Sequence, residues 1–146
     1  MVKIKKSKIK NSIKKLDLKI GHKLILKKKM TKKFLTNSIS YLNDYSKIHT
    51  SDFVAKKIGF KKKIFPGLAV TSFFSKIIGS KISKHNIVIL KIGFDFKLPV
   101  YENDLLVFKC VIKNILFPIK IILMDLEIKR SNKTIVNGQS TCKFMI

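Results

Sequence analysis

The sequence predicts an α+β protein in which an antiparallel sheet wraps around one long central helix. Helical patterns occupy the first half of the chain and strand patterns occupy the second half, an order that is typical of α+β folds. The segment 66–79 is apolar on almost every side and holds one lysine, Lys76, in a chain that is rich in lysine elsewhere. A helix with this pattern is buried, so we expect it at the centre of the domain.

A basic leader precedes the domain. Residues 1–16 contain no acidic residue, and we expect a flexible arm followed by one folded domain over residues 17–146. Ile9, Ile13 and Leu16 follow helical spacing, so an amphipathic helix that binds a membrane surface or directs the chain to an organelle is the alternative. Transit peptides prefer Arg and Ser, which favours a cytoplasmic location.

The first elements of the domain are short. Leu24 and Leu26 alternate with lysines and predict a strand. Thr31 is a suitable N-cap for a helix. The apolar face of that helix consists of Phe34, Leu35, Ile39 and Leu42. The segment 51–59 predicts a shorter helix that ends near Gly59.

A meander of long strands follows the central helix. Proline, asparagine and acidic residues mark the turns between the strands. The expected strands are Asn86–Leu98, Leu105–Asn114, Ile119–Lys129 and Thr134–Phe144.

Composition excludes several classes of protein. With 146 residues and 46% hydrophobic content, the chain forms one ordinary domain and is not disordered. No apolar run reaches the roughly 18 residues that a membrane-spanning helix needs, and no signal peptide is visible. Cys110 and Cys142 lack the spacing of a zinc site or of a disulfide framework, so we expect two small buried side chains and no metal.

The net charge is +24, from 32 basic and 8 acidic residues. Such a charge is typical of nucleic-acid-binding proteins, but Arg130 is the only arginine, and phosphate and base recognition favours arginine. Because isoleucine is also abundant and alanine is scarce, we attribute the charge first to the codon composition of an A/T-rich genome. The field nevertheless attracts polyanions: nucleic acid, a phosphorylated cofactor or an acidic carrier protein.

Three features are candidates for chemistry. Asp44 and His49 lie five positions apart in a polar loop, and a carboxylate and an imidazole at that spacing can share one water molecule. Gly67 begins the central helix, where free N–H groups can stabilise an oxyanion. Ser75 lies two turns further along, where a buried hydroxyl needs a partner. It either bonds back to its own helix or holds Asp44.

The stretch from Tyr41 to Gly79 and the strand that follows resemble the MaoC-like dehydratases, the R-specific enoyl-CoA hydratases of the hot-dog fold. The family's Asp-x-Asn-Pro-aliphatic-His loop corresponds to Asp44-Tyr45-Ser46-Lys47-Ile48-His49. Its step into the central helix corresponds to Pro66-Gly67, and its Phe-x-x-Pro-Val strand to Phe96-Lys97-Leu98-Pro99-Val100. Its Gly-Asp turn corresponds to Asn103-Asp104, and the similarity spans residues 17–144.

The resemblance implies a single hot-dog domain, a homodimer, and reversible hydration of a trans-2-enoyl thioester to the R-3-hydroxyacyl thioester. Asp44 and His49 would hold the water as the catalytic pair, the Gly67 amide would bind the thioester oxygen, and Ser75 would orient Asp44. No metal or redox cofactor is implied, because coenzyme A or acyl carrier protein enters as part of the substrate. The acyl chain length and the carrier stay open.

Departures from the family pattern define the alternatives. The loop Asn-Pro is replaced by Ser46-Lys47, which releases the loop that aims the catalytic pair and leaves open a catalytically degenerate acyl-binding subunit. The replacements Pro66 and Asn103 are mild, because proline suits a helix start and asparagine tolerates positive φ. A thioesterase of the same fold and a basic nucleic-acid-binding protein are further alternatives. The Asp-to-His spacing favours the hydratase.

Overall fold

The computed structural model of the protein describes residues 18–82 and 86–145. The expected leader, residues 1–16, and its expected boundary with the domain at residue 17 lie outside the described residues.

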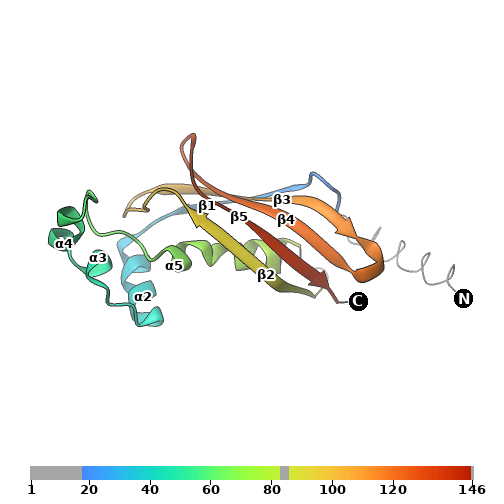
Figure 1. The fold of residues 1–146 in the computed structure, drawn as a ribbon, viewed down its shortest axis with the longest axis horizontal. Coiled ribbons are helices and arrows are strands. Elements are labelled where there is room, and N and C mark those ends of the chain that lie inside the picture. Colours follow the sequence, from blue (N-terminus) through green and yellow to red (C-terminus); the bar gives the residue numbers. More distant parts are fainter. Residues whose placement is uncertain (1–17, 83–85, 146) are drawn as a thin grey trace, which may run out of the picture.

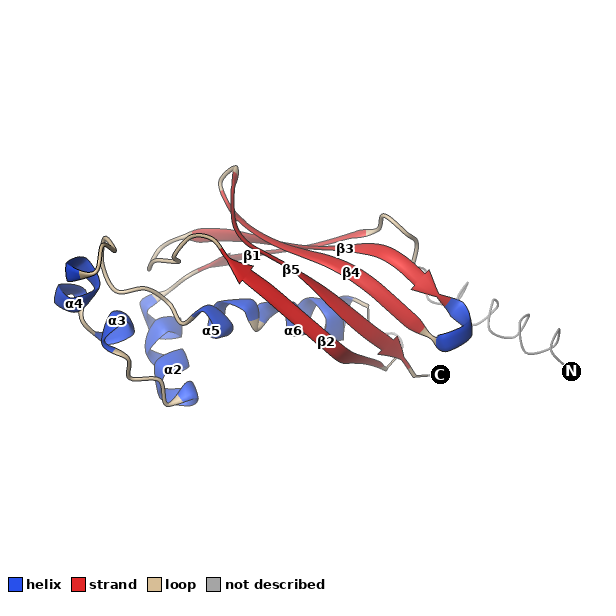
Figure 2. Cartoon of the chain, in the orientation of Figure 1, coloured by secondary structure: helices blue, strands red, loops and turns tan. Residues whose placement is uncertain are grey.

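A five-stranded antiparallel sheet forms one layer, and a helical segment runs beneath one of its faces (Figures 1 and 2). The strands are β1 (Lys23–Lys29), β2 (Ile87–Phe96), β3 (Leu105–Leu116), β4 (Ile121–Arg130) and β5 (Lys133–Phe144). They lie in the order β1-β3-β4-β5-β2. The predicted α+β class and the helix packed against the sheet are confirmed.

The expected meander is wrong at one strand. β3, β4 and β5 are successive neighbours, but β2 pairs with β5 instead of β3. The connection after β2 therefore carries the chain from one edge of the sheet to β3, which lies beside the opposite edge strand β1. The alternation of apolar residues within a strand does not reveal such a crossing. Between β3 and β4 the short 3₁₀ helix η2 (Phe117–Ile119) delays the start of β4 beyond the predicted residue.

The helices gather at one end of the sheet and along its inner face (Figure 2). The first group is α2 (Lys32–Leu42), α3 (Lys47–Thr50) and α4 (Asp52–Lys57). The central segment consists of α5 (Gly67–Thr71), α6 (Phe73–Lys76) and the π-helical turn η1 (Ile77–Lys81). The predicted cap of α2 is confirmed, because the Thr31 hydroxyl accepts a hydrogen bond of 3.2 Å from the Phe34 N–H.

The central segment is buried on one side only. Val70, Phe74 and Ile77 point into the core, whereas Leu68 is 69% exposed and Ser75 is also exposed. The expectation of a helix that is buried all round is therefore wrong for the single chain. The sheet covers only the face of the helix that lies against it.

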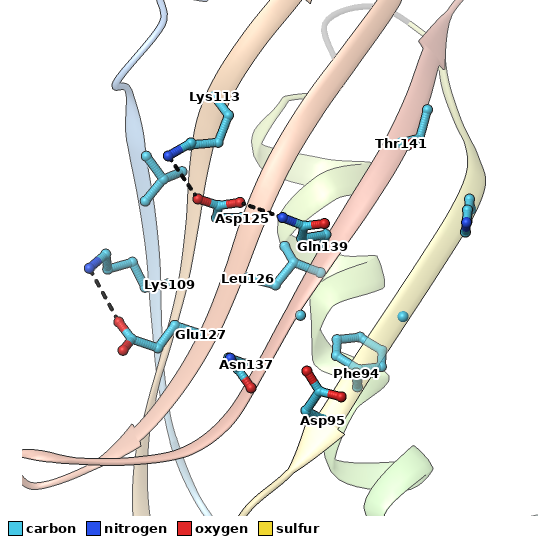
Figure 3. A pocket seen from close by; sticks show the side chains of 14 residues that line it. Phe94, Asp95, Lys109, Lys113, Asp125, Leu126, Glu127, Asn137, Gln139 and Thr141 are labelled. Atoms are coloured by element: carbon cyan, nitrogen blue, oxygen red, sulfur yellow. Dashed lines mark hydrogen bonds and ion pairs between the residues drawn. The ribbon is translucent and has the colours of Figure 1, made fainter.

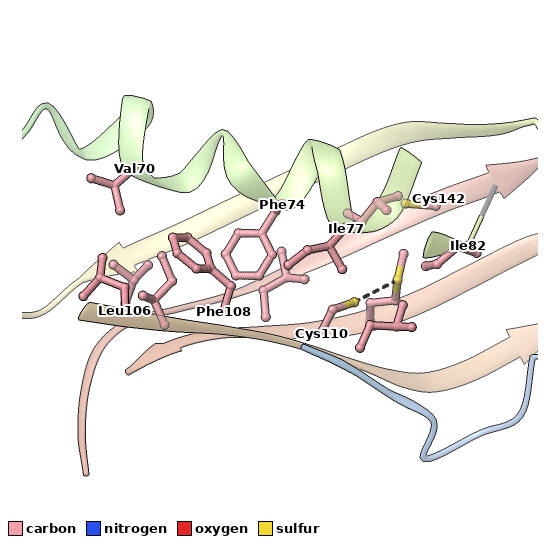
Figure 4. Close-up of a cluster of buried hydrophobic side chains, with 14 of the residues drawn as sticks. Val70, Phe74, Ile77, Ile82, Leu106, Phe108, Cys110 and Cys142 are labelled. Atoms are coloured by element: carbon pink, nitrogen blue, oxygen red, sulfur yellow. Dashed lines mark hydrogen bonds between the residues drawn. The ribbon is translucent and has the colours of Figure 1, made fainter. Parts of the chain in front are cut away.

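The core lies between this helix and the inner face of the sheet (Figure 4). The Phe74 ring packs edge-on against Phe108 of β3, with 5.6 Å between centroids, and stacks on Phe94 of β2 at the same distance. These contacts join three separate elements around one ring. Aromatic pairs in this geometry add to the free energy gained by burying their apolar area.

Both cysteines lie in this core, as predicted. Burial raises the pKa of the Cys110 thiol to about 12, and burial also raises the pKa of Cys142. The thiolate is the reactive form of cysteine. Both groups are thus protected twice, by inaccessibility and by protonation.

We therefore expect neither thiol to react with Ellman's reagent at pH 8 in the native protein. Both should react once guanidinium chloride unfolds the chain, and the denatured protein calibrates the endpoint. Reaction in the folded state at the rate of a free thiol would contradict the buried placement.

Candidate functional site

The loop after α2 places Asp44 beside the start of α3. Asn43 ends α2 with a left-handed backbone, φ 53°. Asp44 then accepts a hydrogen bond of 3.2 Å at Oδ1 from the backbone N–H of Ser46. The second carboxylate oxygen, Oδ2, is left to face His49, which α3 carries.

A hydrogen bond to a backbone carbonyl of another segment holds the buried His49 ring. Nδ1 lies 2.8 Å from the carbonyl oxygen of Ile64. A carbonyl can only accept, so Nδ1 carries the proton, and Nε2 holds the lone pair when the ring is neutral. Nε2 lies 3.5 Å from Asp44 Oδ2, and the Asp44 side chain is 42% exposed. The structure thus brings the two predicted groups together, with Nε2 toward the carboxylate.

Gly67 is the first residue of α5, with Pro66 as the N-cap. Its N–H makes no hydrogen bond with any residue that the structure describes, as expected for the first turn of a helix. A Cβ at this position would lie 2.6 Å from Cε1 of Phe96. The Phe96 ring therefore lies directly against the start of the helix, and glycine leaves room for it.

His49 and Gly67 line one cavity of about 470 Å³. The wall is almost entirely apolar, and besides His49 its ionisable side chain is Lys97. The remaining lining residues are Ile48, Phe60, Ile64, Phe65, Leu68, Val70, Phe96, Leu98, Pro99, Val100 and Val136. Such a cavity is chemically suited to an apolar group, with one imidazole and the start of a helix in its wall.

Ser75 does not take the expected position. It is exposed, and its hydroxyl forms no hydrogen bond with Asp44 or with its own helix among the described residues. The expectation of a buried Ser75 hydroxyl is wrong, because the outward face of the central helix is uncovered in the single chain. The Ser46 N–H is the group that holds Asp44 in this structure.

A larger hollow, of about 990 Å³, lies over the outer face of the sheet (Figure 3). Two pairs of its charged side chains form ion pairs across strands: Lys109 with Glu127 at 3.3 Å, and Lys113 with Asp125 at 3.1 Å. Neither His49 nor Gly67 reaches it. We interpret this face as a solvated sheet surface.

Arg130 fixes one wall of the cavity. Its Nη1 donates to the Pro99 carbonyl at 3.0 Å and to Asp104 Oδ2 at 2.6 Å. The Tyr101 N–H donates to the same Asp104 oxygen at 2.9 Å. Asn103 turns this loop at φ 73°, as its replacement of the family glycine predicted. The sequence singled out Arg130 as the lone arginine but did not reveal this function.

Within residues 18–82 and 86–145, no group of three or more His, Cys, Asp or Glu side chains lies together in a way that could hold a metal ion. No helix in these ranges is long and apolar enough to cross a membrane.

Comparison with known proteins places the fold. The (R)-hydratase from A. caviae involved in PHA biosynthesis superposes with a TM-score of 0.82 and 21% identity, over 88% of this chain and 98% of that one. R-hydratase PhaJ1 from Pseudomonas aeruginosa gives a TM-score of 0.79 and 19% identity, over 88% and 83%. The HadBC complex (3R-hydroxyacyl-ACP dehydratase) from Mycobacterium tuberculosis gives 0.71 and 14%, over 84% and 96%.

The chain therefore has the fold of the MaoC-like dehydratases and R-hydratases, the hot-dog fold, as the resemblance implied. No protein-family model matches the sequence, and no curated protein matches it. At these identities the similarity establishes the fold, and the chemistry has to be argued from the site.

We expect Arg130→Met to lower the free energy of unfolding by about 2–3 kcal/mol, because it removes a charged hydrogen-bond donor and leaves the mostly buried Asp104 carboxylate unpaired. Arg130→Lys should lower the free energy of unfolding by less, because the ammonium keeps a positive charge beside Asp104 even though it lacks the planar guanidinium group. Urea unfolding measures both.

Lys113→Met is the matched control, because it breaks an ion pair in which both side chains are largely exposed. Its cost should stay below about 0.5 kcal/mol. Equal losses for Arg130→Met and Lys113→Met would show that Arg130 does not anchor the loop.

Proposed function

We propose that the protein hydrates trans-2-enoyl thioesters reversibly to R-3-hydroxyacyl thioesters. One observation carries this proposal: the Nε2 lone pair of His49 faces Asp44 at the wall of an apolar cavity that is also lined by Gly67, whose N–H has no partner among the described residues. A base, a carboxylate and an oxyanion donor around an apolar chain are the groups that this reaction needs. The fold shared with hydratases and dehydratases supports it.

The proposed reaction begins with a water molecule that donates one hydrogen to His49 Nε2 and the other to Asp44 Oδ2. As the water oxygen bonds to C3, Nε2 takes a proton from it, and the C2–C3 π electrons shift toward the thioester oxygen. The Gly67 N–H binds that oxygen as it becomes enolate-like. The pair then returns a proton to C2, which restores the thioester and completes the addition of water.

The Ile64 carbonyl determines which nitrogen of His49 acts as the base in this scheme. Because the Ile64 carbonyl accepts a hydrogen bond from the Nδ1–H, the proton of the neutral ring stays on Nδ1 and Nε2 is left as the base. When Nε2 is protonated, the same carbonyl and the Asp44 carboxylate stabilise the resulting cation. No metal or redox group is required by this chemistry.

We also propose that the chain acts as a homodimer. β2 is an edge strand with exposed apolar side chains on it, among them Val88 and Leu90, and the outward face of the central helix is uncovered. Natural proteins rarely leave a long apolar edge free. The ChsH1-ChsH2 and HadBC structures, both complexes of this fold, support an assembly of subunits.

His49→Asn should lower kcat for crotonyl-CoA hydration by 10²–10⁴-fold, a typical contribution of a positioned acid–base group. The asparagine amide can still donate to the Ile64 carbonyl, so the loop is retained while Nε2 is lost. Asp44→Asn should show a loss of similar order. Ultraviolet absorbance of the enoyl thioester follows the reaction.

His22→Ala is the control, because His22 is exposed and lies outside the cavity. Hydration that is unaffected by His49→Asn would refute the proposed base. A folded wild-type protein that binds acyl thioesters without turnover would favour the degenerate acyl-binding subunit instead.

Light scattering during size-exclusion chromatography should give about twice the chain mass of 16.8 kDa. Leu90→Lys, which places a charge on the exposed edge of β2, should shift the mass to that of one chain at micromolar concentration. A wild-type monomer at high concentration would contradict the dimer.

A further inference from the structure

We propose that the acyl chain is delivered by an acidic carrier protein that docks on the α4 surface, which consists of Phe53, Lys56, Lys57, Ile58 and Lys61–Lys63. The inference rests on the proposed hydratase function and names the carrier that this site uses. It comes from the position, the charge and the apolar content of this surface.

The α4 surface adjoins the cavity. Phe60 and Ile64 both line the cavity, and the run Lys61–Lys63 lies between them in the chain. α4 precedes this run directly and forms the end of the molecule that projects away from the sheet (Figure 1). A macromolecule bound there would meet the protein at the rim of the cavity without covering the sheet.

The lysines of the α4 surface are not neutralised. None of them forms an ion pair with a residue that the structure describes. The nearby Asp52 carboxylate accepts from the backbone N–H of Lys63 at 2.8 Å, and Lys62 Nζ donates to the backbone carbonyl of Glu102. On the outer face of the sheet, by contrast, Lys109 and Lys113 form ion pairs across strands (Figure 3). Positive charge therefore remains available at the cavity rim.

Apolar side chains lie among these lysines. Phe53 is 77% exposed and Ile58 is 56% exposed. Exposed aromatic and aliphatic side chains that neighbour lysines in the chain fit a protein partner, because protein interfaces combine apolar and charged groups. This combination of unpaired positive charge and exposed apolar area supports an acidic protein as the partner, and the comparison with coenzyme A below tests that choice.

The α4 surface is held rigidly. The Ser51 hydroxyl caps α4 by accepting from the Val54 N–H at 3.3 Å, and Ala55 is fully buried beneath the helix. The Phe60 N–H donates to the Ala55 carbonyl at 3.0 Å, and the Lys61 N–H donates to the Tyr101 hydroxyl at 3.3 Å. A surface that is ordered before binding loses little conformational entropy on docking.

The test compares one acyl group on three carriers: crotonyl on a bacterial acyl carrier protein, on coenzyme A and on uncharged N-acetylcysteamine. The variant Lys56→Glu/Lys57→Glu/Lys61→Glu reverses charge on the α4 surface. The control Lys27→Glu/Lys29→Glu/Lys33→Glu makes the same charge change on exposed lysines of β1 and α2, outside the cavity wall. Fluorescence anisotropy measures carrier binding separately from turnover.

With the carrier-bound substrate, the α4 variant should lose at least tenfold in kcat/KM, mostly through KM, and the control should lose less than twofold. Turnover of the N-acetylcysteamine thioester should be unchanged in both. Equal losses in the two variants, or a loss with coenzyme A as large as with the carrier protein, would overturn the docking proposal. Absence of turnover with every substrate would refute the hydratase instead, and unaltered carrier binding by the α4 variant would then overturn the docking independently.

Discussion

The segment Ile64–Phe65 is the constraint on which the site depends. The Ile64 N–H donates to the Ile48 carbonyl, and the Ile64 carbonyl accepts from the His49 ring. The Phe65 N–H donates to the Val100 carbonyl. The same segment leads through Pro66 into the central helix. The His49 ring, the Gly67 N–H and part of the cavity wall are therefore placed by one extended piece of backbone. A shift of this segment would displace all three at once.

The acidic side chains have different partners on the outer face of the sheet and on the α4 surface. On the outer sheet face, Asp125 and Glu127 neutralise lysines across strands. At the cavity rim the lysines have no such partners among the described residues, and the carboxylate of Asp52 bonds to backbone instead.

Local signals in the sequence predicted those parts of the site that depend on chain spacing. Asp44 and His49 lie five positions apart, although the expected loop is wrong for His49, which lies on the short helix α3, and Gly67 follows a proline at a helix start. Their placement follows from short-range geometry. The Ile64 carbonyl could not be predicted, because a backbone acceptor has no sequence signature. Ser75 was misplaced since helical periodicity predicts an apolar segment without showing which side the sheet covers.

The sequence by itself determined the main helix and strand segments, the Thr31 cap and the separation of the candidate groups, because these depend on propensities and periodicities within a few residues. Only the tertiary structure decided that β2 pairs with β5, that Arg130 anchors Pro99, and that Phe96 lies against Gly67. Each of these joins residues distant in the chain. Such pairings are selected by the packing of the whole core, which no local pattern encodes.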